Sequence, residues 1–204
     1  IEQVSINPEG LTTIALSYSN LFDSTQVMVD DNVVHSVGTQ DLGAVSLTLD
    51  NLSLNGMESI KTLAYKDGKS YESLESQALF FDVFDVQTRY STDFSSASDQ
   101  LVFSGFKTGY ESGFSNIALH TTHPHPSSLE LISILKTPVQ INETDAILKF
   151  EEIVIVETGE AGTSFGDEGF WDYVIVEGST DGLNWIPFLD GYDSDAYPEW
   201  NSAY

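Results

Sequence analysis

The feature that most constrains the fold is the run at residues 170–185, where aromatic and β-branched residues surround one turn. Residues 172–177 have the composition of a short strand. The Ser-Thr-Asp-Gly sequence at 179–182 predicts a tight reversal, because Asp-Gly tolerates positive φ. Residues 185–189 predict the returning strand, which lies at an edge or carries a bulge because Pro187 has no N–H. A lone hairpin buries too little surface, so the run predicts a surrounding β-sandwich.

The rest of the chain also predicts short strands separated by turns, among them hairpins at 26–37, through the turn Asp30-Asp31-Asn32, and at 59–73, through the turn Lys66-Asp67-Gly68-Lys69. Residues 1–86 contain about seven of them, at the spacing of an immunoglobulin or fibronectin type III sandwich. A linker is expected at 85–89. Beyond it, residues 146–156 alternate with apolar side chains on both faces, which predicts a central strand. We therefore expect an all-β chain of two tandem antiparallel β-sandwiches, over residues 1–86 and 87–204.

The charge balance restricts the partners. The 204 residues include 7 Lys and Arg against 32 Asp and Glu, and residues 151–204 have no Lys, Arg or His. Such a surface repels nucleic acid and anionic membranes, and no apolar run approaches the length of a membrane span. Cations, Ca²⁺ first, are the natural partners, although the acidity could serve only to keep an extracellular protein soluble. The absence of Cys excludes disulfides and thiolate chemistry.

An ordered series of motifs follows residue 90. It runs through Asp93-Phe94, Gly113-Phe114-Ser115, Leu119-His120-Thr121 with His123-Pro124, Ile134-Leu135-Lys136-Thr137-Pro138, Phe150-Glu151-Glu152-Ile153-Val154, Val156-Glu157, Phe170-Trp171-Asp172-Tyr173-Val174, Val176-Glu177-Gly178-Ser179-Thr180-Asp181-Gly182, Trp185 and Asp190-Gly191-Tyr192-Asp193. The series resembles a jelly-roll module of large surface proteins exported by the type IX secretion system of Bacteroidota. More distantly, it is similar to MAM-like and laminin-G-like jelly rolls.

The resemblance implies a jelly roll over 87–204 and a non-catalytic, extracellular or outer-cell-surface role in adhesion, glycan contact or spacing. The sequence departs from the pattern in having a single Gly, Gly182, where the hairpin turn usually has two. The series also stops before the last strands of a jelly roll. We therefore expect a module that is incomplete at its C-terminus, in an excerpt of a longer chain whose other modules are possible partners.

Carboxylates of separate strands in a jelly roll can surround one structural Ca²⁺. The candidate ligands are Asp93, Glu157 and Asp172, followed by Glu152 and Glu177. Asp172 and Glu177 are five residues apart and lie on opposite faces of a regular strand, so they share a site only across a bulge. The alternative is a solvated acidic rim with no ion.

Three histidines, His120, His123 and His125, lie within six residues. Neutral imidazoles at this spacing can bind Zn²⁺ or Ni²⁺, and the intervening Pro124 and Pro126 favour a rigid loop. No glutamate follows the helical metalloprotease pattern. A polar loop without metal is the alternative, and the sequence leaves the choice open.

Catalysis has weaker support. Glu151 with Glu152, or Asp167 with Asp172, could serve a glycosidase, but adjacent strand residues point to opposite faces. The sequence has no nucleophile elbow, phosphate loop or dinucleotide fingerprint. We expect no enzyme activity in this chain.

Aromatic rings stack on sugars, which makes a glycan the first candidate ligand besides a surface protein. Trp171, Tyr192 and Tyr197 are the predicted ligand-binding residues, while Trp185 after the turn is expected in the core. Adhesion or spacing, stabilised by calcium, is the expected function. A carbohydrate-binding accessory module of a secreted hydrolase is the alternative.

Overall fold

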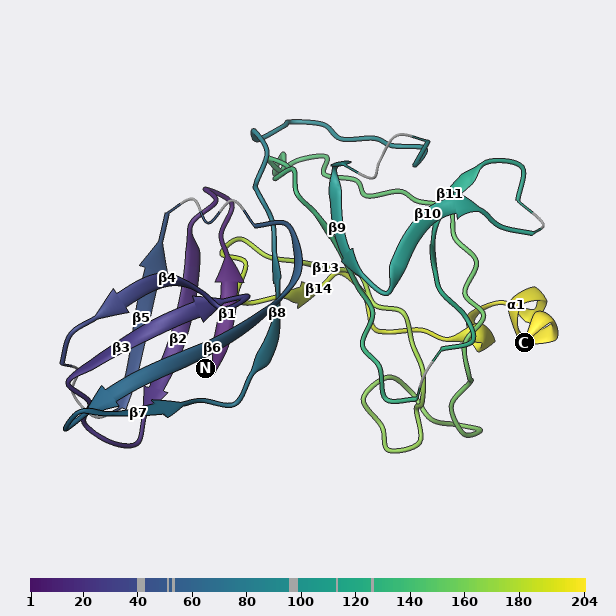
Figure 1. Cartoon of the computed structure of the whole chain (residues 1–204). Helices are drawn as coiled ribbons and strands as arrows, with labels where there is room; N and C mark the ends of the chain where they lie inside the picture. The colour runs from purple at the N-terminus through teal and green to yellow at the C-terminus, as the bar shows by residue number, and fades with distance from the viewer. Residues whose placement is uncertain (40–42, 51, 53, 96–98, 113, 126) are drawn as a thin grey trace. The chain divides into compact units, whose positions relative to one another are not determined.

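The computed structural model describes residues 1–204 except 40–42, 51, 53, 96–98, 113 and 126, so Gly113 and Pro126 of the motifs above lie outside the described residues. The fold class is confirmed: the regular structure is almost entirely β, and the ladders of the described residues are antiparallel (Figure 1). Its internal contacts form two units, Ile1–Ile141 and Asn142–Tyr204. The expected boundary at 86/87 falls inside the first unit and stays a prediction, as do the immunoglobulin-like and jelly-roll topologies.

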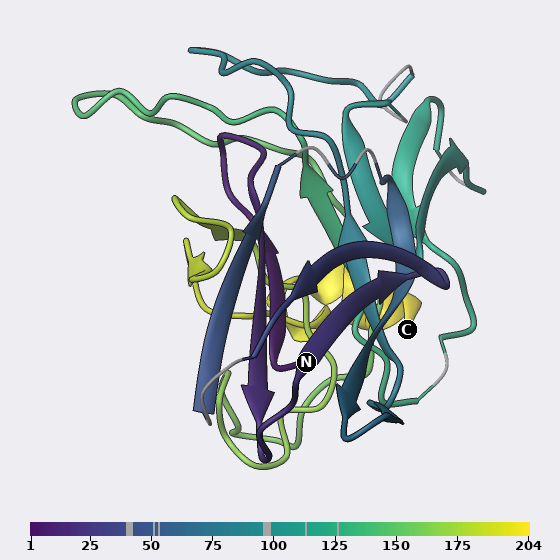
Figure 2. The ribbon, with the colours of Figure 1, turned by 60° about the vertical axis from the view of Figure 1, so that its left-hand side comes forward.

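Unit 1 begins with a β-sandwich. One sheet has the order β1-β2-β5, from the strands β1 (Gln3–Ile6), β2 (Thr12–Tyr18) and β5 (Gly43–Leu49). The other has the order β4-β3-β6-β7, with β8 also paired to β6. Its strands are β3 (Ser24–Val29), β4 (Asn32–Val37), β6 (Gly56–Lys66), β7 (Lys69–Glu72) and β8 (Ser76–Phe80). Two views of the ribbon show the sheets as separate layers (Figures 1 and 2).

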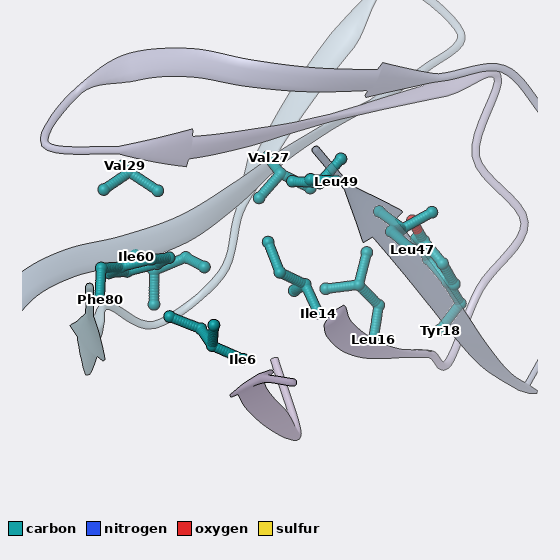
Figure 3. Packing of buried hydrophobic residues seen from close by; sticks show 10 residues of the cluster. All are labelled: Ile6, Ile14, Leu16, Tyr18, Val27, Val29, Leu47, Leu49, Ile60 and Phe80. Atoms are coloured by element: carbon teal, nitrogen blue, oxygen red, sulfur yellow. The ribbon is translucent and has the colours of Figure 1, made fainter. Parts of the chain in front are cut away.

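Alternation of apolar and polar residues places one face of each sheet in the core. The burial pattern of β3 alternates along its six residues, and Val27 and Val29 are buried. From the opposite sheet, Ile14 and Leu16 of β2 meet them, and Phe80 closes the core (Figure 3). The hairpins β3–β4 and β6–β7 confirm the predictions from their Asp-Asp-Asn and Lys-Asp-Gly-Lys turns.

The remainder of unit 1 consists of two further strand pairs. β9 (Leu101–Ser104) pairs with β12 (Ile132–Leu135), and β10 (Phe106–Tyr110) pairs with β11 (Ile117–Thr121). The register of the second pair places Lys107 opposite His120.

Unit 2 has little regular structure. Among the described residues, its strand pairing consists of the ladder that joins β13 (Glu177–Gly178) to β14 (Ile186–Pro187) and an isolated bridge between Val174 and Tyr192. The ladder confirms the hairpin of the opening run, but over two residues per strand. The 3₁₀ helix η2 (Ser194–Ala196) and the helix α1 (Pro198–Ala203) end the chain. In the part of the chain that the structure describes, no helix combines the length and apolarity needed to cross a membrane.

The central strand predicted at 146–156 is wrong. These residues belong to no ladder, and Ile147, Leu148 and Phe150 are exposed. The alternating pattern correctly marked a segment with strand-forming composition, but a strand needs a hydrogen-bonded neighbour. No neighbouring segment in the described chain supplies one.

Candidate functional site

The segment Gly191–Ser194 holds unit 2 together through buried polar contacts. The Ser194 hydroxyl, which is fully buried, donates to the Val156 carbonyl at 2.7 Å and accepts from the Val156 N–H at 2.8 Å. The buried Asp193 carboxylate accepts the N–H of Gly159 at 3.0 Å and that of Asp195 at 2.8 Å. Buried polar groups require such partners, so these bonds fix residues 154–159 against the start of η2.

Tyr192 connects the same two segments. Its hydroxyl donates to Glu152 Oε1 at 2.7 Å, and its main chain exchanges two hydrogen bonds with Val174, at 2.8 and 3.0 Å. Partial burial raises the pKa of the Tyr192 hydroxyl, and its hydrogen bond to the Glu152 carboxylate raises that pKa further. Tyr192 and Glu152, predicted as a sugar contact and a calcium ligand respectively, are thus each other's partners.

Gly191 lies against an aromatic group. Phe165 and Tyr173 are in edge contact with ring centroids 5.0 Å apart, and Phe170 lies within 6.2 Å of both. A Cβ at position 191 would lie 2.5 Å from a Phe165 ring carbon, so only glycine permits this approach. The Asp-Gly-Tyr-Asp sequence at 190–193 was part of the motif series, but sequence reasoning gave Gly191 and Ser194 no role.

The predicted turn forms at residues 179–184. Asp181 Oδ1 accepts the N–H groups of Leu183 at 2.9 Å and Asn184 at 2.7 Å, and its Oδ2 accepts the Asn184 amide at 2.7 Å. These bonds, the Asn184 N–H first, lower the pKa of the Asp181 carboxyl far below its usual range. Gly182 supplies the positive φ, +68°.

Aromatic side chains on unit 2 are widely exposed. Trp171 and Tyr197 are 51% and 56% exposed, as predicted for ligand contacts, and Tyr197 packs edgewise on Trp200 at 4.5 Å. Trp185 is 41% exposed, so its expected place in the core is wrong. The returning strand is too short, at two residues, to carry the Trp185 side chain under a second layer.

The predicted calcium ligands are distributed over both units. Asp93 belongs to unit 1, while Glu152, Glu157, Asp172 and Glu177 are exposed on unit 2. Among the residues that the structure describes, no three His, Asp or Glu side chains are gathered closely enough to hold a metal ion. The five carboxylates as a set therefore stay a prediction, and Asp172 and Glu177 are not brought together in such a group.

Asp93 does line a polar hollow of about 440 Å³ together with Ser91, Thr92 and Gln100. Asp93 Oδ1 accepts the Ser95 hydroxyl at 2.7 Å and the Ser95 N–H at 3.0 Å. These bonds lower the pKa of the Asp93 carboxyl, the hydroxyl contributing most. The hollow thus offers an ionised carboxylate beside hydroxyl and amide oxygens, the donor types that Ca²⁺ accepts.

The histidine loop has an acidic neighbour that the sequence did not reveal. Glu111 Oε1 lies 3.1 Å from His120 Nδ1, and Glu111 Oε2 lies 3.9 Å from His123 Nε2. His120 Nδ1 also lies 3.1 Å from the Thr121 carbonyl, and His125 Nε2 lies 2.8 Å from the Thr121 hydroxyl. The β10–β11 register pairs His120 with Lys107 and not with Glu111, so a predicted hairpin alone would not have indicated this contact. A Cβ at Gly109 would lie 3.4 Å from His120 Nε2, so the lack of a side chain at Gly109 leaves room for the His120 ring beside the ladder.

No protein-family model, curated protein or solved structure matches this chain. The likeness of residues 90–204 to exported jelly rolls therefore stays an expectation.

Proposed function

We propose that the chain is a non-catalytic binding module of a secreted surface protein, which contacts an extracellular glycan or surface protein through exposed aromatic side chains of unit 2. The observation that carries the proposal is the exposure of Trp171, Tyr173 and Tyr197, each near half of its full accessible area. Large exposed aromatic side chains are candidates for an interaction surface in a soluble protein.

The acidic surface supports an extracellular ligand other than nucleic acid. Residues 142–204 hold 15 Asp and Glu residues and one basic residue, Lys149. Carboxylates beside aromatic rings suit sugar hydroxyls, which donate hydrogen bonds while the ring covers an apolar sugar face. The same charges repel phosphate backbones.

Calcium is the second part of the proposal. The hollow beside Asp93 supports this part, because its lining residues Ser91, Thr92, Asp93 and Gln100 carry oxygen donors of the types that Ca²⁺ binds. Bound Ca²⁺ would stabilise the folded chain by mass action.

The test combines binding and stability. Binding to a panel of glycans and extracellular matrix proteins is measured for the wild type, for Trp171→Ala, and for Tyr110→Ala, which removes an exposed ring from unit 1. The proposal expects that Trp171→Ala loses binding to the ligand, whereas the wild type and Tyr110→Ala keep it. Equal binding by all three proteins would contradict it. Separately, a chelator should lower the melting temperature of the wild type but not of Asp93→Asn, and no change in the wild type would remove the calcium part.

A carbohydrate-binding accessory module of a secreted hydrolase is the alternative. The exposed Trp171 and Tyr197 favour it, because flat rings are the usual sugar platforms. Binding to polysaccharides only, with no matrix protein bound, would select this alternative over adhesion.

A further inference from the structure

The segment at residues 146–156 has the composition of a strand but lacks the partners of one. Residues 146–159 contain no helix, turn or strand, and none of them has positive φ. Within the described chain, residues 146–153 and Ile155 form no backbone hydrogen bond. Unpaired main-chain groups on a β-prone segment form a template for another strand.

One edge of this segment is already occupied. The Ser194 hydroxyl contacts the carbonyls of Val154 at 3.3 Å and Val156 at 2.7 Å, as well as the Val156 N–H. Successive residues of an extended chain present their main-chain groups to opposite edges. The N–H and C=O groups of Ile153 and Ile155 therefore face the other edge, where no main-chain group of the described residues bonds to them.

The side chains of the segment are also uncovered. Ile147 and Leu148 are 72% and 60% exposed, and Phe150, Ile153 and Ile155 are about half exposed. The described residues of unit 2 include a single buried apolar side chain, Val154. An added strand would cover apolar side chains and satisfy main-chain groups in one step.

Charge selects the partner. The segment and its flank carry Glu151, Glu152 and Glu157 around the sole basic residue of unit 2, Lys149. A second copy would bring 15 acidic residues against 15, which is repulsive, whereas a basic strand is attracted. Glu151 and Glu157 are exposed and free to meet Lys or Arg side chains from a partner.

We infer that residues 146–156 bind an extended segment of another polypeptide, with alternating apolar and basic residues, by β-strand addition at the edge opposite Ser194. This inference rests on the proposed binding function and names the class of its protein partner. Main-chain hydrogen bonds supply affinity in such complexes, and alternate side chains supply specificity.

The test measures binding of a fluorescent peptide of alternating Val and Lys to the whole chain by anisotropy. Two peptide controls are used: one of alternating Val and Glu, and the Val-Lys peptide with two central Val residues replaced by Pro, which keeps the charge and removes ladder donors. Strand addition predicts that the Val-Lys peptide binds at least about tenfold tighter than either control. The Pro-containing peptide loses ladder donors, and the Val-Glu peptide brings like charge against the acidic segment.

Two protein variants locate the site. Ile153→Pro removes an N–H that has no partner in the free chain, so the variant should fold normally and bind about tenfold more weakly. Glu151→Lys should weaken binding, whereas Glu160→Lys, the same charge change at an exposed position outside the segment, should weaken it less. If Ile153→Pro fails to fold, the Pro-containing peptide still tests whether binding depends on main-chain ladder bonds, because it removes donors from the other strand.

Several results would overturn the inference. Equal binding of the Val-Lys and Pro-containing peptides would indicate charge attraction alone. A folded wild type that binds neither peptide would exclude the site. A wild-type dimer dissociated by Ile153→Pro in sedimentation would assign the edge to a second copy. The wild type could fail to bind the Val-Lys peptide and still bind a glycan or matrix protein in a way that Trp171→Ala abolishes. That result would remove this inference and leave the proposed function intact.

Discussion

Unit 1 and unit 2 are both rich in apolar residues, but they bury them differently. Among the described residues, 12 buried apolar side chains belong to unit 1 and one, Val154, belongs to unit 2. Unit 1 places them between two sheets whose strands run up to 11 residues. Unit 2 has strands of two residues and is tied instead by buried polar groups, Asp193 and Ser194 above all.

This difference shows what a ladder contributes beyond its hydrogen bonds. A long strand turns every second side chain to the same face, so two facing sheets bury a continuous core. A segment without a ladder leaves its apolar residues on both sides in solvent. Relative to its length, unit 2 therefore exposes more large apolar side chains, and the stability is expected in unit 1.

The largest expected effect is the difference in the free energy of unfolding between two truncations, one of a phenylalanine in each unit. Phe80→Ala removes a side chain that is 1% exposed, and we expect a loss of about 3–5 kcal/mol in the free energy of unfolding. Phe150→Ala, at 49% exposure, should change it by less than about 0.5 kcal/mol. Urea denaturation followed by circular dichroism measures both. Similar losses would break the comparison.

Ser194→Ala tests the buried hydrogen bonds that join Ser194 to Val156 in unit 2. Removing the hydroxyl leaves the Val156 N–H and C=O without their partner, at a cost of about 1–3 kcal/mol. All three Trp residues lie in unit 2, so tryptophan fluorescence during denaturation reports this unit. Ser202→Ala, which removes an exposed hydroxyl of α1 bonded to the Pro198 carbonyl, is the control. Equal transitions in the two variants would contradict the role of Ser194.

Asp181→Asn should give a smaller effect that depends on pH. The pKa of Asp181 is lowered in the folded chain, so its ionised form stabilises the turn. The contribution is complete above the unfolded pKa of about 3.9 and is lost as pH falls below it. The stability gap between wild type and variant, measured by tryptophan fluorescence, should be widest near neutral pH and narrow in acid. Asp190→Asn is the control, and a gap that does not vary with pH would contradict the assignment.

The smallest expected effect concerns the histidine loop of unit 1. The hypothesis that this loop binds zinc predicts a rise of a few degrees in melting temperature on adding Zn²⁺. Glu111→Gln and His120→Ala should abolish the rise because both side chains lie at the 3.1 Å contact. His35→Ala, in β4, should leave it unchanged. A wild-type melting temperature that Zn²⁺ does not change would contradict the zinc hypothesis and favour a polar loop without metal.

The local predictions succeeded where a turn determined them. The hairpin of β3 and β4 and the turn at 179–184 follow from Asp, Asn and Gly at positions that need positive φ or a side-chain acceptor. Predictions that depended on contacts with residues distant in the sequence were wrong. Trp185 and residues 146–156 were expected in a core. Trp185 and most of these residues, Val154 excepted, are exposed because no second layer covers them in the described chain.

In the candidate site too, local features could be predicted from the sequence, and contacts between distant residues could not. Exposure of Trp171 and Tyr197 could be predicted from their places beside turns. The bond between Tyr192 and Glu152 spans 40 residues, and that between Gly159 and Asp193 spans 34. No local pattern encodes contacts at such separations, so sequence reasoning assigned Tyr192 and Glu152 to different ligands.

By itself the sequence determined the all-β class, the acidic surface and the positions of the turns, because these depend on composition and on the conformational preferences of neighbouring residues. Only the tertiary structure decided which apolar residues are buried, and that Ser194 and Asp193 hold residues 154–159. The physical reason is that burial and pairing are properties of two segments at once, and the choice of the second segment is a balance over the whole chain.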